Sequence, residues 1–340
     1  MGSVILGTGA YVPERVLSNF DLENMVETSD EWITTRTGIK TRHIAGVGEN
    51  TSNIAAKAAE DALRNAGLAA ADLDLIIVAT ITCETGMPSC ACLVQKELEA
   101  SNAFAFDINA ACSGFIYALD LADKYISNNP DMTVMVIGAE TLSSRTNWQD
   151  RNTCVLFGDG AGACILTGGG AERGILGSKL FSDGSLWHLL SMESASSRNP
   201  NIGPGAITDK NADFAEFGYP RNGEGAYIKM AGREVFKHAV RAMEDSIGHV
   251  LRSENITSEE LKLVIPHQAN IRILKSLVDR LDVDSEKVFI NVYKYGNTSA
   301  ASIPLALNEA NSEGRLQEGD LLLLCAFGGG FTWGAMLMRW

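Results

Sequence analysis

Cys112 stands in the sequence where a nucleophile could form. It follows the predicted strand Phe104 to Ile108 and opens an apolar helix, with small residues on either side. Unpaired backbone N–H groups and the positive end of a helix dipole both favour a thiolate at such a position. The pattern therefore predicts a thiol nucleophile, and a buried structural cysteine is the competing interpretation.

His267 and Asn297 also lie near the ends of predicted strands, where ligand sites form. Of five histidines, His267 is the one that directly follows an apolar strand, Leu263 to Pro266. Asn297 opens a predicted helix that mirrors the helix of Cys112. An imidazole and an amide at strand ends can donate hydrogen bonds to a substrate. A structural histidine and a helix N-cap are the alternatives for these two residues.

Glycine clusters and cysteine spacing bear on other kinds of chemistry. Gly328 to Gly330 follow an apolar strand, where free N–H groups suit an oxyanion hole, although a packing turn is the alternative. The cluster Gly158 to Gly162 precedes a strand rather than a helix, which argues against dinucleotide binding. Cys90 and Cys92 lack a second ligand pair, so we expect no metal site.

An internal repeat supplies the elements that would position these residues. Each half is predicted to contain the same order of helices and strands, and each ends with a Gly-rich turn into a strand. In the first half these are helix 52–66, strand 75–79, helix 90–99, strand 104–108, helix 112–126, strand 133–137 and strand 158–166. In the second half they are helix 232–252, strand 263–266, helix 271–281, strand 288–292, helix 297–310, strand 321–325 and strand 328–338.

This alternation predicts an α/β protein. Strands that alternate with helices form parallel sheets covered by helices on both faces. Two such halves, 1–170 and 171–340, indicate a layered α/β/α/β/α body. Ligands bind at the carboxyl ends of parallel strands, so each half should supply part of one central site. The irregular stretch 185–226 is predicted to be a long surface excursion.

Composition limits the partners and the location of the chain. Lys and Arg number 28 against 42 Asp and Glu, a formal net charge of -14, which argues against a nucleic acid partner. An acidic protein partner would need a local basic patch. The apolar run Leu321 to Met338 contains three adjacent glycines, so it predicts two buried strands rather than a membrane span. With no export signal at the start, we expect a cytoplasmic protein.

The motifs, taken together, are typical of one family. They are Ser29 to Ile33 with Thr35 to Ile39, Cys112 with Ala111 and Gly114, Phe157 to Gly162, Pro266 to Asn270, Gly296 to Ser302 and Phe327 to Trp333. In this order they resemble β-ketoacyl-acyl carrier protein synthase III, a family of the thiolase superfamily. The resemblance covers nearly the whole chain.

The resemblance implies a thiolase-like fold of two pseudo-repeated βαβαβαββ halves, and a condensing enzyme. Cys112 would take the acyl group of a short acyl-CoA starter, such as acetyl-CoA, as a thioester. His267 and Asn297 would act on malonyl-acyl carrier protein as it loses carbon dioxide, and the N–H groups of Cys112 and Gly329 would form the oxyanion hole. The product, a 3-oxoacyl-acyl carrier protein, would initiate fatty acid synthesis. The resemblance also implies a homodimer with no cofactor, since acyl-CoA is a substrate.

The resemblance indicates three further sets of contacts. For CoA these are Trp32, Arg36, Thr37, Arg151 and Asn270. For carrier-protein docking they are Gln268 and a basic patch of Lys237, Arg272, Lys275 and Arg280, which Asp279 weakens. For the acyl pocket they are Phe327 and Met87. Met87 stands where the family often has an aromatic residue that reaches the neighbouring subunit, and a flexible methionine could admit a longer or branched starter.

Other functions fit the same residues. A condensing enzyme or acyltransferase of a specialised pathway would use a different starter or acceptor. A noncatalytic module would bind acyl-CoA or the carrier protein, but the presence of Cys112, His267 and Asn297 argues against it. A Cys-His hydrolase would let water release the acyl group.

Overall fold

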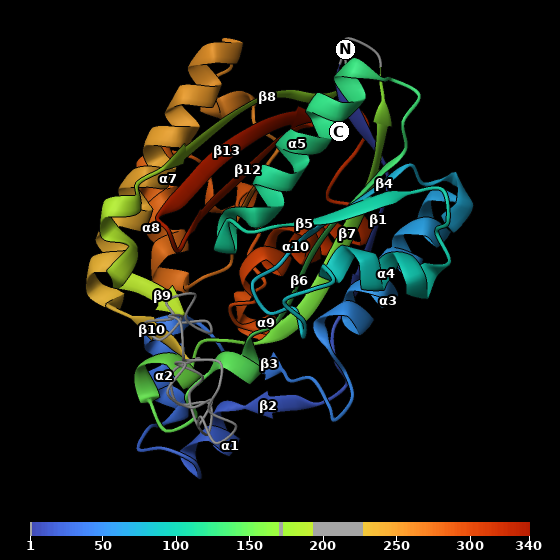
Figure 1. Ribbon diagram of the computed structural model, residues 1–340. Helices are drawn as coiled ribbons and strands as arrows, with labels where there is room; N and C mark the ends of the chain where they lie inside the picture. Colours follow the sequence, from blue (N-terminus) through green and yellow to red (C-terminus); the bar gives the residue numbers. More distant parts are fainter. Residues whose placement is uncertain (1, 170–172, 193–226) are drawn as a thin grey trace, which may run out of the picture.

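Two β-sheets organise the chain (Figure 1). The computed structural model describes residues 2–169, 173–192 and 227–340. The first sheet contains β1 (Ser3–Tyr11), β4 (Leu75–Ala79), β5 (Phe104–Ile108), β6 (Val134–Thr141) and β7 (Asp159–Gly168), in the spatial order β1-β7-β6-β4-β5. The second contains β8 (Gly174–Ser182), β11 (Leu263–Pro266), β12 (Leu321–Gly328) and β13 (Thr332–Arg339), in the order β11-β12-β13-β8.

The two sheets are paired in the same way. β4 pairs in parallel with β5 and β6, while β7 pairs antiparallel with β6 and β1. Correspondingly, β12 pairs in parallel with β11, while β13 pairs antiparallel with β12 and β8. The same order of elements therefore occurs twice, and the division at residues 170 and 171 stays a prediction.

The predicted strand 288–292 is wrong. In its place the structure has a single bridge between Val288 and Val264, followed by the short helix α9 (Val292–Tyr295). The N–H groups of Asn291 and Val292 donate to Gln268 Oε1, at 3.0 and 3.2 Å, instead of to a neighbouring strand. The Gln268 side chain therefore ends the strand pairing here.

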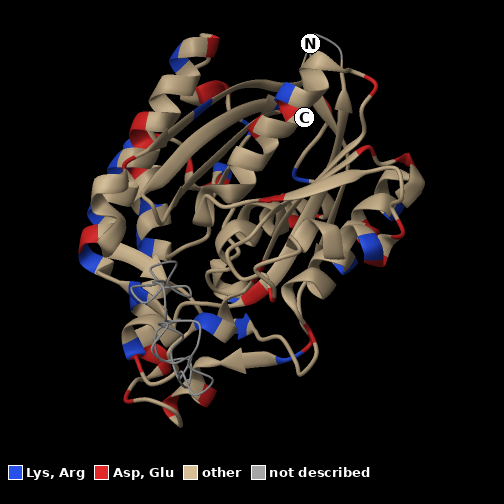
Figure 2. Cartoon of the chain, in the orientation of Figure 1, with Lys and Arg blue, Asp and Glu red and all other residues tan. Residues whose placement is uncertain are grey.

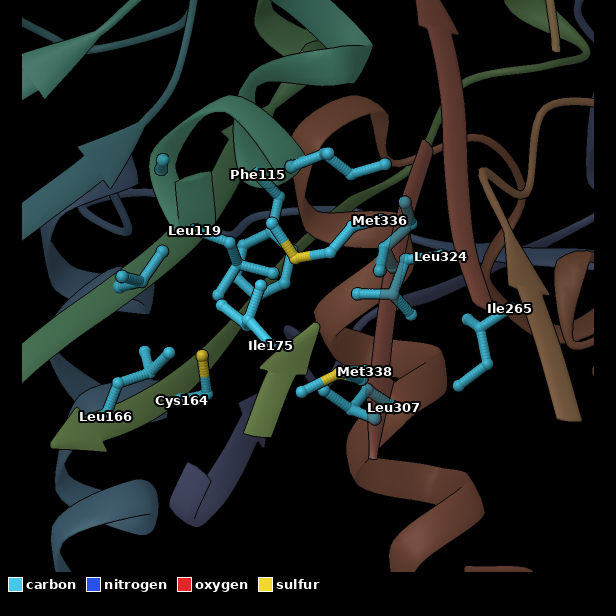
Figure 3. Packing of buried hydrophobic residues seen from close by; sticks show 14 of the residues in the cluster. Phe115, Leu119, Cys164, Leu166, Ile175, Ile265, Leu307, Leu324, Met336 and Met338 are labelled. Atoms are coloured by element: carbon cyan, nitrogen blue, oxygen red, sulfur yellow. The ribbon is translucent and has the colours of Figure 1, made fainter. Parts of the chain in front are cut away.

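Helices form three layers around the sheets (Figure 1). The middle layer is α5 (Gly114–Asn128) and α10 (Ser302–Ser312); the outer layers are α3 (Thr51–Ala66) with α4 (Cys90–Leu98), and α7 (Gly232–Glu254) with α8 (Ile271–Leu281). Figure 3 shows Phe115 and Leu119 of α5 packed beside Met336 of β13. Apolar surface buried between the layers stabilises the stack. The α/β/α/β/α body is thus confirmed.

The helices predicted to open at Cys112 and Asn297 begin later than expected. Each is preceded by a 3-10 turn, η2 (Ala111–Ser113) before α5 and η9 (Ser299–Ala301) before α10. Ala111 and Ser299 have positive φ angles of 47° and 50°, which an α-helix cannot include. Cys112 therefore lies in a tight turn, whereas Asn297 lies two residues before one and forms a bridge with Phe157. The two turns pack against each other, which brings both residues to one place.

The other predicted helices and strands are confirmed, with ends that differ by at most four residues. Additional short elements form a cap at one end of the sheets. They are β2 (Val16–Ser18), α1 (Asn19–Glu23), α2 (Asp30–Thr37), β3 (Thr41–His43), α6 (Arg151–Cys154), β9 (Leu190–Met192) and β10 (Ile228–Met230). The fully buried Arg42 ties this cap together, because its guanidinium donates to the carbonyls of Leu17 and Val155.

Most of the predicted excursion 185–226 lies outside the described residues, since 193–226 are not among them. Its first part is more regular than expected: the 3-10 helix η4 (Gly184–Leu189) leads into β9, which pairs with β10. None of the helices in the described ranges combines the length and the apolar composition that a bilayer crossing requires.

Candidate active site

A cavity of about 1040 Å³ holds the three side chains that the sequence indicated for chemistry. Cys112 lies on η2, His267 follows β11, and Asn297 precedes η9, and all three line the cavity. The end of β12 contributes Phe327, and Gly329 follows it. The outer wall includes Trp32, Arg36, Thr37, Lys237, Asn270 and Arg272. The structure therefore gathers residues from both halves of the chain at one site.

Cys112 differs from the expectation of a thiolate. Burial raises the pKa of its thiol to about 11, and the charge of Glu140 adds to the rise. A hydrogen bond with the Ser299 side chain acts in the opposite direction, but desolvation is the larger effect. At neutral pH the group is a thiol, so its proton must leave during any acyl transfer.

The backbone of Cys112 is tightly enclosed by the glycine turn. A Cβ atom at Gly328 would lie 2.6 Å from the Cys112 nitrogen, which is closer than real side-chain contacts allow. Glycine at this position therefore gives β12 its close approach to the N–H of Cys112. Gly329, the next residue, lines the cavity. The two residues predicted for the oxyanion hole, Cys112 and Gly329, thus line the same cavity.

His267 is a neutral and oriented imidazole. It is 3% exposed, and burial lowers its pKa to about 4. Its Nδ1 lies 2.6 Å from Ser302 Oγ, and this hydroxyl accepts the Gln268 N–H at 3.3 Å. We assign the hydroxyl proton to the Ser302–Nδ1 bond, which places the ring proton on Nε2. His267 then offers an N–H donor, and the sequence did not indicate Ser302 as its partner.

The Asn297 side chain is oriented by its own turn. Its Oδ1 accepts the Ser299 N–H at 2.9 Å, while its backbone is held on both sides by Leu156 and Gly158. This contact fixes which end of the amide faces the cavity. Among the described residues, no group accepts a hydrogen bond from its amide nitrogen, so both N–H groups remain for a substrate. The N-cap alternative explains the hydrogen bond that Asn297 Oδ1 accepts, but it gives no role to the side-chain nitrogen.

Glu140 is a buried carboxyl group beside Cys112 that the sequence analysis missed. Its Oε2 accepts from the Thr82 hydroxyl at 2.5 Å, the Ile81 N–H at 3.2 Å and the Thr80 hydroxyl at 3.3 Å. Its Oε1 and the Ser299 hydroxyl are both buried without a partner of good geometry. Burial raises the pKa of Glu140 to about 7. A glutamate in the otherwise apolar strand β6 was the signal that could have identified it.

The charge of Glu140 should control the pH dependence of Cys112 alkylation. In the wild type, Glu140 ionises near pH 7 and its charge then disfavours the Cys112 thiolate. In Glu140→Gln no charge forms, so we expect roughly threefold faster alkylation by iodoacetamide above about pH 8 and similar rates below about pH 6. Rates would be followed by the mass of the digested peptide that contains Cys112, because intact mass would also count alkylation of Cys83. Asp159→Asn, a change at another buried carboxylate, is the matched control, and identical profiles for Glu140→Gln and wild type would contradict this role.

Trp32, with two arginine side chains against its ring, lies at the outer wall of the cavity. The Arg36 and Arg151 guanidinium carbons lie 4.5 and 4.9 Å from the centre of the Trp32 ring. Arg151 also donates to the Glu27 carbonyl at 2.9 Å. These contacts concentrate positive charge and a flat apolar surface at one place, which suits a nucleotide with phosphates. Arg151 itself does not line the cavity, although it lies against the Trp32 ring that does.

Gln268 and Met87 are placed differently from the expectation, whereas Thr37 and Asn270 line the cavity as expected. Gln268 is 1% exposed and donates to the Pro266 and Phe289 carbonyls, so it is corrected from a docking residue to a structural one. Thr37 bonds the Ile33 carbonyl within α2. Asn270 caps α8 by accepting the Arg272 N–H. Met87 is 88% exposed and does not line the cavity of its own chain.

The predicted basic patch is smaller than its residue types suggest. Lys237 pairs with Glu234 at 2.8 Å, and Arg280 pairs with Glu244. Figure 2 shows Lys and Arg mixed with Asp and Glu along α7 and α8. Arg272 and Lys275 are exposed, and no acidic partner is found for either within the described residues. These two residues form the core of the patch.

Comparisons with known proteins agree with this geometry. Two family models match: 3-oxoacyl-[acyl-carrier-protein] synthase III over residues 106–184, and the C-terminal part of the same synthase over residues 251–340. A β-ketoacyl-[acyl-carrier-protein] synthase III from Desulfotalea psychrophila is 54% identical over 340 residues, with all of both chains covered. The chain belongs to the β-ketoacyl-acyl carrier protein synthase III family. The resemblance stated from the motifs is thereby confirmed.

Solved structures of this family have the same fold. The 3-oxoacyl-[acyl-carrier-protein] synthase III from Aquifex aeolicus VF5 superposes with a TM-score of 0.89, at 50% identity and with full coverage of both chains. The priming β-ketosynthase of the R1128 polyketide biosynthetic pathway has a TM-score of 0.87 at 32% identity, covering 99% of this chain and 96% of its own. The chain is thus also similar to a synthase of a polyketide pathway.

Proposed function

We propose that this enzyme condenses a short acyl-CoA with malonyl-acyl carrier protein, with loss of carbon dioxide, to give the 3-oxoacyl-acyl carrier protein that initiates fatty acid synthesis. One observation carries the proposal: a single cavity holds a thiol with a raised pKa, a neutral imidazole and an oriented amide. A condensing enzyme needs a covalent acyl carrier and neutral donors for an enolate. It does not need a charged base at either donor position.

The first step is acyl transfer to Cys112. The sulfur attacks the thioester carbonyl of acyl-CoA, the carbonyl carbon–sulfur bond to CoA breaks, and the proton of the thiol leaves with CoA. The N–H groups of Cys112 and Gly329 stabilise the tetrahedral oxyanion, and one such donor contributes about 3 kcal/mol.

The second step is decarboxylation followed by carbon–carbon bond formation. As the malonyl group loses carbon dioxide, negative charge develops on its thioester oxygen. His267 Nε2–H and the Asn297 amide donate to this oxygen and stabilise the enolate. The carbanion then attacks the acyl-Cys112 carbonyl, and the Cys112 sulfur leaves. Neither donor carries a charge that would repel the malonyl carboxylate.

A direct assay tests the reaction. Purified enzyme would be mixed with malonyl-acyl carrier protein and a panel of acetyl, propionyl, isobutyryl and octanoyl CoA, and the carrier protein would be weighed by mass spectrometry. We expect a 3-oxoacyl carrier for at least one starter. Hydrolysis of the acyl-enzyme without condensation would favour the hydrolase instead, and condensation only with unusual starters would favour a specialised pathway.

Several surrounding contacts support the substrate assignment. We infer that the Trp32 ring and the guanidinium groups of Arg36 and Arg151 hold the adenine and phosphates of CoA, with Asn270 near the pantetheine arm. Phe327 lines the cavity, and we infer that it contacts the acyl group. The exposure of Met87 supports a homodimer in which this side chain enters the neighbouring acyl pocket. We further propose that the enzyme acts in the cytoplasm without a cofactor.

Carrier-protein docking should depend on the exposed charge of α8. The acidic carrier would meet Arg272 and Lys275, and Asp279 on the same helix would oppose it. We expect Lys275→Glu to raise KM for malonyl-acyl carrier protein roughly threefold and Asp279→Lys to lower it by a similar factor, with KM for acyl-CoA unchanged.

Initial rates at two salt concentrations measure these changes, because screening should reduce both effects. The two substitutions serve as controls for each other, since they reverse the charge of one helix surface in opposite senses. If both variants shift KM in the same direction, or neither shifts it, docking does not occur on this surface.

A further inference from the structure

Cys83 and Cys90 form a sulfur pair at the two ends of an exposed loop, outside the catalytic cavity. The Cys83 sulfur, the Cys90 sulfur and a Glu84 carboxylate oxygen lie within 4.8 Å of one another. Cys83 is partly exposed, whereas Cys90 is fully buried at the start of α4. A disulfide has an S–S length of about 2.05 Å, so the sulfurs are within about 3 Å of bonding. From this geometry, we propose that Cys83 and Cys90 are a redox-active dithiol, which a hydroperoxide converts to a disulfide that closes the loop 84–89.

The surroundings of the pair hold one sulfur in place and leave the other partly exposed in the single chain. The Cys90 N–H donates to Asp107 Oδ2 at 2.7 Å, which anchors the first turn of α4. Cys83 lies 3.6 Å from the Thr85 hydroxyl and 3.8 Å from Glu84 Oε2, and Glu84 is itself held by the Ser52 side chain. A fixed buried sulfur beside an accessible one is the arrangement that a resolving and an attacking cysteine require.

The proton shared by the two thiols selects Cys83 as the attacking group. Hydrogen bonding from Cys90 is the main cause that lowers the pKa of Cys83 to about 6, and the same interaction raises the pKa of Cys90. The facing charged groups are the carboxylates of Glu84 and Asp107, and Glu84 opposes part of the lowering. At neutral pH Cys83 is therefore a thiolate, whereas the buried Cys112 is a thiol. Peroxide reacts with thiolates, so it should oxidise Cys83 first.

The reaction balances with the hydroperoxide as the oxidant. The Cys83 thiolate attacks one oxygen of hydrogen peroxide, an S–O bond forms, the O–O bond breaks, and the leaving hydroxide takes a proton to become water. The Cys90 sulfur then attacks the Cys83 sulfur, an S–S bond forms, and the S–O bond breaks. The proton of Cys90 leaves with the second hydroxide as water. Two thiols lose two electrons, and one peroxide becomes two waters.

The bridge would constrain the segment that carries Met87. A disulfide removes conformational freedom from the residues that it encloses. Closing the bridge would therefore hold Met87 within one small ring. The consequence for starter choice rests on the proposed function, because it assumes that Met87 shapes an acyl pocket. The bridge itself is a property of the loop and can be detected without any activity.

A peptide experiment tests the bridge. The folded enzyme would be treated with one equivalent of hydrogen peroxide, blocked with iodoacetamide and digested with trypsin and an enzyme that cleaves after Glu. No Lys or Arg lies between Arg64 and Lys96, but cleavage after Glu84 separates Cys83 from Cys90 and Cys92. Fragments 65–84 and 85–96 should then remain linked, with a mass two hydrogens lower than their sum, until dithiothreitol releases them.

Single substitutions identify the partner. Cys83→Ser and Cys90→Ser should abolish the linked fragments, whereas Cys92→Ser should retain them, because the Cys92 sulfur faces the Ala105 carbonyl at 3.7 Å. Thermal melting checks that each variant is folded. If Cys90→Ser does not fold, Cys83→Ser, which changes the partly exposed sulfur, provides the test of the linkage. The proposal is overturned by sulfinic acid at Cys83 without linkage, by linkage that survives Cys90→Ser, or by no oxidation at either residue. A linked loop without condensing activity would refute the proposed function alone.

Discussion

Cys112→Ala should abolish covalent loading of the enzyme. Wild-type enzyme incubated with a suitable acyl-CoA should gain the mass of one acyl group, whereas the variant should keep its original mass. Condensation should fall by roughly 10⁴-fold or more, because the thioester on Cys112 carries the acyl chain between the two steps. Intact-mass spectrometry after incubation with the starter panel, and with malonyl-CoA, makes the measurement.

Cys92→Ala is the matched control for this change. Cys92 is a half-buried cysteine that does not line the cavity, so its loss should leave both the adduct and the rate unchanged. An acyl adduct on Cys112→Ala would place the nucleophile at another residue. If wild-type enzyme shows no adduct with any CoA of the panel, the starter is carried by another donor or the chain is a binding module.

Asn297→Asp should separate the two steps of the reaction. The carboxylate can still accept the Ser299 N–H, so the turn is preserved, but it cannot donate to the enolate and it repels the malonyl group. We expect condensation to fall by roughly 10³-fold, since a lost oxyanion donor alone costs 10²- to 10³-fold. Acylation of Cys112, measured by quenching and intact mass, should change by less than about threefold.

Asn297→Ala distinguishes the lost donor from the added charge. It removes the donor without introducing a carboxylate, so its condensation rate should lie between those of wild type and Asn297→Asp. Equal losses of acylation and condensation in Asn297→Asp would show that Asn297 supports the cavity as a whole. If condensation were slower in Asn297→Ala than in Asn297→Asp, charge repulsion would not be the cause of the loss in Asn297→Asp.

The sequence predicted the fold well because its signals are local and repeated. Helical periodicity and short apolar strands recur in the same order in both halves, and crossover rules leave few ways to arrange them. The failure at 288–292 has a specific cause. The apolar run there is suited to a strand, but Gln268 Oε1 takes the N–H groups that a neighbouring strand would need. A side chain that competes for backbone donors from more than twenty residues away leaves no periodic signal.

The catalytic candidates were found because the ends of parallel strands converge in space. Their protonation states could not be predicted from the sequence, because protonation depends on the packing around each group. The pKa of Cys112 is raised and that of His267 is lowered by the same cause, desolvation. Ser302, which orients His267, belongs to a motif that the sequence analysis quoted without assigning it this contact. Glu140 was visible only as a charged residue in a buried strand.

The sequence by itself determined the family, the repeated α/β architecture, and the types of the three residues brought to one cavity. These properties follow from the sequence, since strand ends and glycine turns are specified by residues that are close together along the chain. Only the tertiary structure decided which groups are charged, which surface lysines lack an acidic partner, and which two of seven cysteines face each other across a loop. Those properties depend on desolvation and on contacts between segments distant in sequence, and both exist only after the layers have packed.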